Sequence, residues 1–242
     1  EILNSSLNLG VSGSGPLTQY AVFSEYSREF INLEKVYLFF FDNDLNDFEL
    51  EFSNNILKNY FINDDFTQNL AKRQKEIDAQ LRFFYNEQNQ IFNEIYIKYN
   101  LIKFIKISKT RQLINLTVDK NKKGIIKCKE YKTDHRIKDE FLTTFDLLNK
   151  KIKKLNAEMT IFFLPSFYRV YCEDLKYENV ILSIKKNFLE KNINYFDLLP
   201  QFIENKDKII FAYKGFSSHY SEYGNKIIFN FLDIFIFSWK DI

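Results

Sequence analysis

Three of the six glycines in this 242-residue chain, Gly10, Gly13 and Gly15, fall within six positions near its start. Such a cluster is typical of a turn that side chains would obstruct. A dinucleotide fingerprint would need glycine where Thr18 stands, and a P-loop would need a lysine that the run lacks. A nucleophile elbow would need glycine in place of Ser14. Two interpretations remain: a tight turn before a helix, or a turn whose backbone N–H stabilises an oxyanion.

Strands that alternate with helices are expected to position this turn. Apolar runs predict four strands, at residues 6–13, 35–41, 159–166 and 193–200. Helical patterns separate them, at residues 17–31, 177–191 and 222–239. The alternation predicts an α/β protein with a central parallel sheet. Ligands of such sheets bind at the carboxyl ends of the strands, and the glycine run follows one predicted strand.

Residues 48–156 interrupt the alternation and are expected to form a mostly helical insertion. The chain is then a single domain, whose sheet core comprises residues 1–47 and 157–242. Three- and four-residue spacing within the insertion predicts one long helix or two consecutive ones, with the apolar positions Leu70, Ile77, Leu81, Phe84, Ile91 and Ile95. A second amphipathic helix is expected at residues 134–155, and a loop or small hairpin at residues 118–132.

The middle of the chain is basic, although the formal net charge of the whole is only +2. Residues 98–154 hold 17 Lys and Arg against 6 Asp and Glu. A solvated face is the ordinary explanation of such a run, and contact with an anionic polymer or a membrane surface is the alternative. Residues 98–112 have the pattern of an interfacial basic helix. Nucleic acid is not an expected partner, because no nucleic-acid-binding motif accompanies the basic residues.

The two cysteines, Cys128 and Cys172, lack the Cys-x-x-Cys spacing of zinc and redox motifs. We therefore expect no metal and no cofactor. No apolar run is long enough to span a bilayer. The chain begins with Glu1 instead of Met, which suggests a fragment or a processed product, so the sequence does not indicate the compartment or the oligomeric state.

Three stretches resemble the second, third and fifth blocks of the SGNH (GDSL-type) hydrolases in order and spacing. They read NLGVSGSGPLTQYAVFSEY from residue 8, VYLFFFDNDLND from residue 36 and FSSHYSEYGNKII from residue 216. FTQNLAKRQKEID and FFLPSFYR fit bacterial branches of that family. The resemblance covers about residues 7–237. It implies a flavodoxin-like, three-layer α/β/α fold and an enzyme that hydrolyses or transfers an acyl ester of a small molecule or a carbohydrate.

The same resemblance implies roles for three residues. Gly13 would give a backbone N–H, and Asn43 a side-chain amide, to the oxyanion hole. His219 would be the general base of a serine acyl-enzyme mechanism. Asp44, next to Asn43, is expected to hydrogen-bond the backbone and fix the turn. The other histidine, His135, is expected to be structural.

The chain departs from the family pattern in three ways. The opening Gly-Asp-Ser block precedes the second block in the family, so the nucleophile is expected upstream of residue 1. Phe216 stands where the family has the acid, three residues before the base, and Asp42 replaces the glycine of the third block. These departures leave an alternative open: a catalytically inactive hydrolase-fold protein that binds an anionic polysaccharide or a membrane surface.

Overall fold

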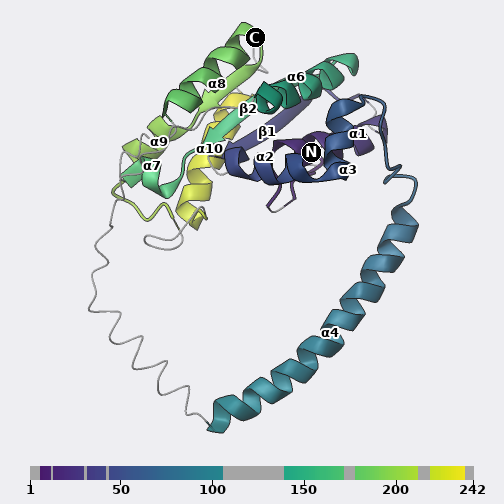
Figure 1. Cartoon of the computed structure of the whole chain (residues 1–242). Helices are drawn as coiled ribbons and strands as arrows, with labels where there is room; N and C mark the ends of the chain where they lie inside the picture. The colour runs from purple at the N-terminus through teal and green to yellow at the C-terminus, as the bar shows by residue number, and fades with distance from the viewer. Residues whose placement is uncertain are drawn as a thin grey trace. The chain divides into compact units, whose positions relative to one another are not determined.

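Three parallel strands form one sheet in the computed structural model, in the order β1-β2-β3 (Figure 1). The structure describes residues 6–11, 13–29, 32–41, 44–105, 139–171, 178–211 and 219–237. The strands are β1 (Lys35–Phe41), β2 (Glu158–Leu164) and β3 (Asn194–Asp197). Lys35 pairs with Glu158, and Thr160 pairs with Asn194. The expected α/β class with a parallel sheet is confirmed.

Helices precede, connect and follow the strands. Before β1 and between β1 and β2 lie α1 (Pro16–Tyr26), the 3-10 turn η2 (Ser27–Glu29), α2 (Asp44–Ser53), α3 (Asn55–Ile62), α4 (Gln74–Ile105) and α6 (Asp139–Lys154). Between β2 and β3 and after β3 lie α7 (Phe167–Tyr171), α8 (Glu178–Glu190), α9 (Leu199–Glu204) and α10 (Glu222–Phe237). Pro200 falls in the first turn of α9, where proline is tolerated, so the apolar run that began in β3 continues as helix.

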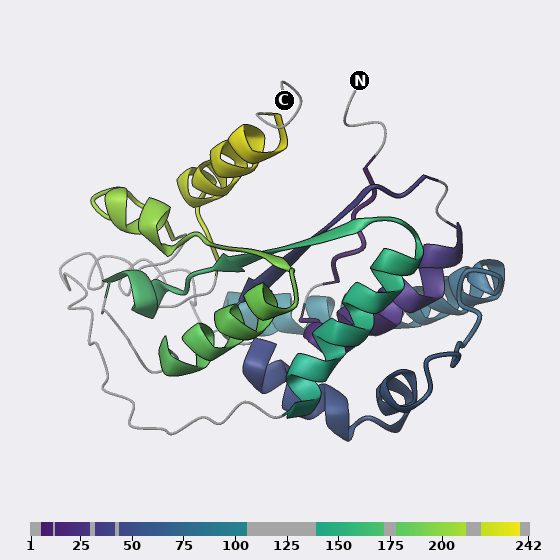
Figure 2. The same ribbon diagram turned by 90° about the horizontal axis from the view of Figure 1, so that it is seen from above.

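Helices cover both faces of the sheet because the strands are apolar on both faces (Figure 2). On one face, Phe40, Ile161 and Phe163 belong to a buried core that also includes side chains from α1, α2, α3, α6 and α8. On the other face, Phe162 and Phe196 pack with residues of α7, α9 and α10. The core is rich in phenylalanine, and many of its rings meet edge to face, an arrangement that aromatic quadrupoles favour.

Asparagine ends the two helices that lead directly into β2 and β3. Asn156 and Asn192 have φ angles of 58° and 55°, in the left-handed region. After α8, the N–H of Ile193 donates to the carbonyl of Phe188 at 2.9 Å, which closes a Schellman motif. In a chain with few glycines, asparagine therefore takes the position that glycine usually occupies.

The chain divides into two compact units, residues Asn69–Ile126 and the remainder. These limits differ from the insertion expected over residues 48–156. Phe48, Tyr60 and Phe145, from α2, α3 and α6, are buried in the core beside the sheet. The spacing of apolar residues shows which face of a helix is buried, but not which element it packs against.

The expected strand at residues 6–13 is wrong for the part of it that the structure describes. Residues 6–11 do not join the sheet. Leu7 and Val11 are exposed, and the chain turns at Gly13, whose φ is 74°. Alternating apolar residues make a strand only where a neighbouring strand pairs with them. The expected loop or hairpin at residues 118–132 lies outside the described residues.

Candidate active site

Gly13 lies in a turn that ends just before α1. The N–H and the hydroxyl of Ser14 both donate to the carbonyl of Val11, at 3.2 and 2.7 Å. Gly13 takes a left-handed conformation that few other residues adopt. A Cβ at Gly13 would have no atom within 4 Å, so glycine is required here by backbone conformation and not by crowding.

At position 15, glycine is required for a different reason, which is close packing. Glu51 of α2 accepts hydrogen bonds from the N–H groups of Gly15 and Leu17, at 2.6 and 3.0 Å. A Cβ on residue 15 would lie 2.8 Å from the same carboxylate and 3.1 Å from Cβ of Asp47. The start of α1 is therefore capped by a negative charge from another helix, which suits the positive end of a helix dipole.

Asp44, the first residue of α2, bonds back to the last residue of β1. The carboxylate of Asp44 is buried and accepts the N–H of Phe41 at 3.1 Å. This bond confirms the expected hydrogen bond of Asp44 to the backbone. Asn43, the predicted oxyanion donor, and Asp42 lie between these two residues and outside the described residues.

His219 is exposed and immediately precedes a tightly held tyrosine. The hydroxyl of Tyr220 donates to the carbonyl of Pro165 at 2.7 Å, and its ring lies 6.4 Å from that of Phe41. Phe41 ends β1, and Pro165 directly follows β2. Tyr220 therefore holds the backbone of His219 at the carboxyl edge of the sheet.

The helix that follows His219 begins at a fixed point. Ser221 donates to the carbonyls of Ile210 and Ile209 through its N–H and its hydroxyl, at 2.8 and 2.5 Å. The hydroxyl of Ser221 also accepts the N–H of Gly224 at 3.1 Å, which caps α10. A Cβ at Gly224 would lie only 2.3 Å from the carbonyl oxygen of Ile210, so glycine permits this close approach.

An ion-pair network around the buried Arg169 occupies the same edge beside β3. Arg169 of α7 donates to both carboxylate oxygens of Asp197, at 3.1 and 3.0 Å, and to Glu178 at 3.2 Å. Burial would lower the pKa of Arg169, but hydrogen bonds and charge interactions with the two carboxylates raise it overall. Asp197 also accepts the N–H of Leu199 at 2.9 Å. Its carboxylate is thus committed to structure, and sequence reasoning did not identify this network.

Two of the three predicted catalytic residues, Gly13 and His219, are among the described residues. Phe216, which replaces the family acid, lies outside them. Ser166 accepts the N–H of Arg169 at 3.4 Å, a weak bond that caps the short helix α7. In this position Ser166 acts as a helix cap, which does not favour it as the nucleophile.

Of the basic residues 98–154, the structure describes residues 98–105 and 139–154. Lys151 and Lys154 of α6 bind Asp64, through its carbonyl at 2.8 Å and its carboxylate at 3.3 Å. A shallow depression beside them is lined by Asp146, Asn149, Lys150, Lys153, Lys154 and Lys191. Lys191 is ion-paired with Asp146. α6 ends just before β2 and α8 ends just before β3, so these lysines lie at the amino edge of the sheet, opposite His219.

Comparison of the chain with protein-family models, with curated proteins and with solved structures finds no match. Within the described ranges, no group of three or more His, Cys, Asp or Glu is arranged to hold a metal ion. Over the same ranges, no helix combines the length and apolar character needed to cross a membrane.

Proposed function

We propose that this chain is most of an SGNH-type ester hydrolase or O-acyl transferase. The observation that carries the proposal is the anchoring of Tyr220, next to His219, to the residues at the ends of β1 and β2. Asn43 lies outside the described residues, but it follows Phe41, which ends β1 at the carboxyl edge of the sheet, by two positions along the chain. This edge is where open parallel sheets bind their ligands.

In the proposed reaction, a serine from the block expected upstream attacks the acyl carbon of an ester. His219 takes the proton of the serine hydroxyl and gives it to the departing alkoxide. The N–H of Gly13 and the amide of Asn43 stabilise the oxyanion of the tetrahedral intermediate. Water, or an acceptor hydroxyl in a transferase, then attacks the acyl-enzyme, with His219 again acting as the base.

The orientation of His219 requires a partner other than the usual acid. Phe216 has no carboxylate, and Asp197, which ends β3 at the same edge of the sheet, is committed to Arg169. We expect a backbone carbonyl or a carboxylate from another segment to hold the imidazole.

The coding DNA upstream of Glu1 provides the first test. We expect a strand that ends in Gly-Asp-Ser or a close variant. Protein from the full reading frame should then react with a fluorophosphonate probe at that serine and hydrolyse p-nitrophenyl acetate, and its Ser-to-Ala variant should do neither. An upstream region without such a serine, or an intact serine that the probe does not label, would contradict the proposal.

A second candidate function is binding without catalysis, and the depression formed by α6 and Lys191 favours it. Three of its exposed lysines, Lys150, Lys153 and Lys154, carry positive charge on the edge opposite His219. An anionic polysaccharide would bind there with a strong dependence on salt.

Dextran sulfate and uncharged dextran provide the probes for this second candidate. We expect the full chain to bind only the sulfated polymer, and Lys150→Glu with Lys153→Glu to weaken binding at least tenfold. Lys185→Glu with Lys186→Glu, on the exposed face of α8, is the matched control and should have a smaller effect. Equal losses in the two double variants would show only a general charge effect and would contradict a site at the depression.

A further inference from the structure

A stripe of large apolar side chains runs along the 32-residue helix α4. Its positions alternate in spacing by four and three, and they are occupied by Ile77, Leu81, Phe84, Gln88, Ile91 and Ile95. This is the heptad pattern of a coiled-coil seam, with positions 81, 88 and 95 at a and positions 77, 84 and 91 at d. Gln88 is the one polar member. With a rise of 1.5 Å per residue, the seam is about 27 Å long.

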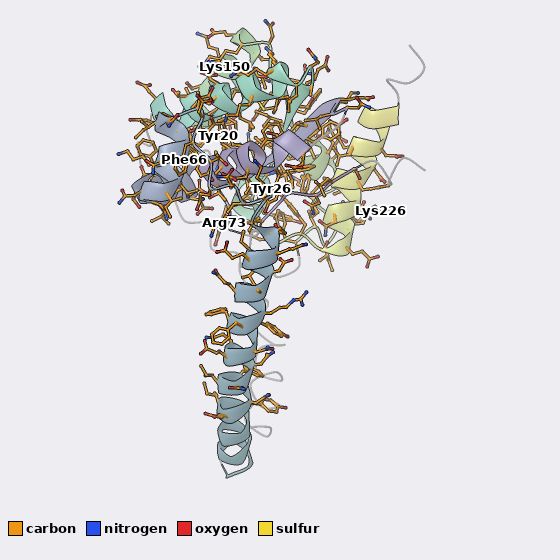
Figure 3. All side chains as sticks on the ribbon, turned by 90° about the vertical axis from the view of Figure 1, so that its right-hand side faces the viewer. Tyr20, Tyr26, Phe66, Arg73, Lys150 and Lys226 are labelled. Atoms are coloured by element: carbon orange, nitrogen blue, oxygen red, sulfur yellow. The ribbon has the colours of Figure 1, made fainter. Side chains whose placement is uncertain are left out.

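Most of the seam is exposed to solvent. The exposed fractions range from 48% to 60% for Leu81, Phe84, Ile91 and Ile95. Tyr85 and Phe92, which flank the seam, are exposed by 66% and 61%. Figure 3 shows aromatic side chains projecting along this helix, which begins just after Arg73. An exposed apolar surface of this extent marks an interaction site.

The charges of α4 favour a protein partner over a lipid surface or a polyanion. Over the whole of α4, four basic residues balance four acidic ones, namely Lys75, Arg82, Lys98 and Lys103 against Glu76, Asp78, Glu87 and Glu94. Helices that bind anionic membranes carry an excess of Lys and Arg on the polar face, and the charges of α4 show no such excess. A second helix with a matching seam is the partner that fits.

We propose that α4 pairs with α4 of a second copy of this chain in a parallel, in-register coiled coil. In this arrangement Gln88 faces Gln88 of the second copy, and the two amides satisfy each other by hydrogen bonding. A polar residue at an a position fixes the register of such a pair.

The antiparallel arrangement that best matches the apolar spacing is less favourable. Pairing about the centre of the seam sets position 77 against 95, 81 against 91 and 84 against 88. Each Gln88 would then face Phe84, with no partner for its amide, and Glu87 would face Glu87 of the second copy. An unpaired buried amide and a pair of like charges both oppose association.

The area that the seam offers is that of a small interface. With about half of the exposed area of each apolar seam residue and each flanking aromatic covered, each helix would lose on the order of 400 Å² to its partner. The pair would then bury about 800 Å², which is typical of a transient protein–protein contact.

The mass of the full chain in solution tests this proposal. We expect multi-angle light scattering and sedimentation equilibrium to give an assembly larger than the monomer at micromolar concentration. Leu81→Glu with Phe84→Glu should weaken association at least a hundredfold while circular dichroism shows a folded protein. Asn86→Glu with Asn93→Glu, at exposed f positions on the opposite face, adds the same charge and should leave association unchanged. A monomeric wild type, or seam variants that associate as wild type does, would overturn the proposal.

Cross-linking tests the orientation. In a background with Cys128→Ser and Cys172→Ser, Leu81→Cys should cross-link to itself through a short bis-maleimide, and Asn86→Cys should not. Mixing the Leu81→Cys and Ile91→Cys variants should give no more cross-linking between positions 81 and 91 than random encounter. Efficient cross-linking of position 81 to position 91 would overturn the parallel arrangement.

Discussion

The carboxylate of Glu51 caps α1 by accepting the backbone N–H of Gly15, with 2.6 Å between oxygen and nitrogen. The two residues are so close that a Cβ on residue 15 would lie 2.8 Å from the other carboxylate oxygen. We therefore expect Gly15→Ala to lower the free energy of unfolding by about 1 to 3 kcal/mol through overpacking. Urea denaturation measures this loss, and an alanine variant as stable as wild type would contradict the close approach.

The charge of the Glu51 carboxylate, as well as its shape, is expected to stabilise the folded chain. Glu51→Gln keeps the volume but leaves a single acceptor oxygen for the N–H groups of Gly15 and Leu17. We expect a loss of about 1 to 2 kcal/mol, because one donor at the buried helix start then lacks a partner. Glu204→Gln, at an exposed position on α9, is the matched control and should change stability by less than about 0.5 kcal/mol.

The asparagine that ends α8 is expected to respond to substitution according to its backbone angle. Asn192→Ala should lower the free energy of unfolding by about 1 kcal/mol, because alanine is disfavoured at a φ of 55°. Asn192→Gly should match or slightly exceed wild type. Thermal and urea unfolding distinguish the two variants. If alanine were tolerated as well as glycine, the left-handed cap would be absent in solution.

Much of the fold could be predicted from local patterns. The apolar run at residues 35–41 ends abruptly at acidic residues, and β1 has these same limits. The three- and four-residue spacing after residue 70 likewise predicted helix, and α4 is one continuous helix. These signals are strong because they depend on the chain's own periodicity.

The long-range contacts could not be predicted in this way. The hydrogen bond from Gly15 to Glu51 joins positions 36 residues apart, and the sequence pattern of α2 does not distinguish Glu51 from an exposed glutamate. The bond between the buried Arg169 and the partly buried Asp197 could not be predicted either, since charged residues are usually exposed. Gly13 and Gly15 belong to one sequence motif, yet glycine is required for different reasons at the two positions. Gly13 has a positive φ, whereas Gly15 packs too closely against Glu51 for a Cβ.

The phenol of Tyr60 should make stability depend on alkaline pH. Burial and a 2.5 Å hydrogen bond to Glu25 raise the pKa of Tyr60 to about 12. Because the neutral phenol is favoured in the folded state, its contribution is fully present below the unfolded pKa of about 10 and is lost as the pH rises towards 12. We expect the free energy of unfolding to fall over this interval.

Tyr60→Phe isolates this effect from that of the other tyrosines. At neutral pH the variant should be less stable by about 1 to 3 kcal/mol, because the buried carboxylate of Glu25 loses a donor. The difference between variant and wild type should then shrink above pH 10. Urea unfolding measured from pH 8 to pH 11 tests this, and a constant difference across that range would contradict the assigned hydrogen bond.

Substitution of His219 should change catalysis without changing stability, because its side chain is exposed. In protein expressed from the full reading frame, His219→Gln should lower kcat/KM for p-nitrophenyl acetate by about 10² to 10⁴, the usual contribution of a general base. The free energy of unfolding should change by less than about 0.5 kcal/mol, as at other exposed positions. His135→Gln replaces the only other histidine and should retain activity. Equal activity of the two variants would remove His219 from the mechanism, even if an upstream serine were present.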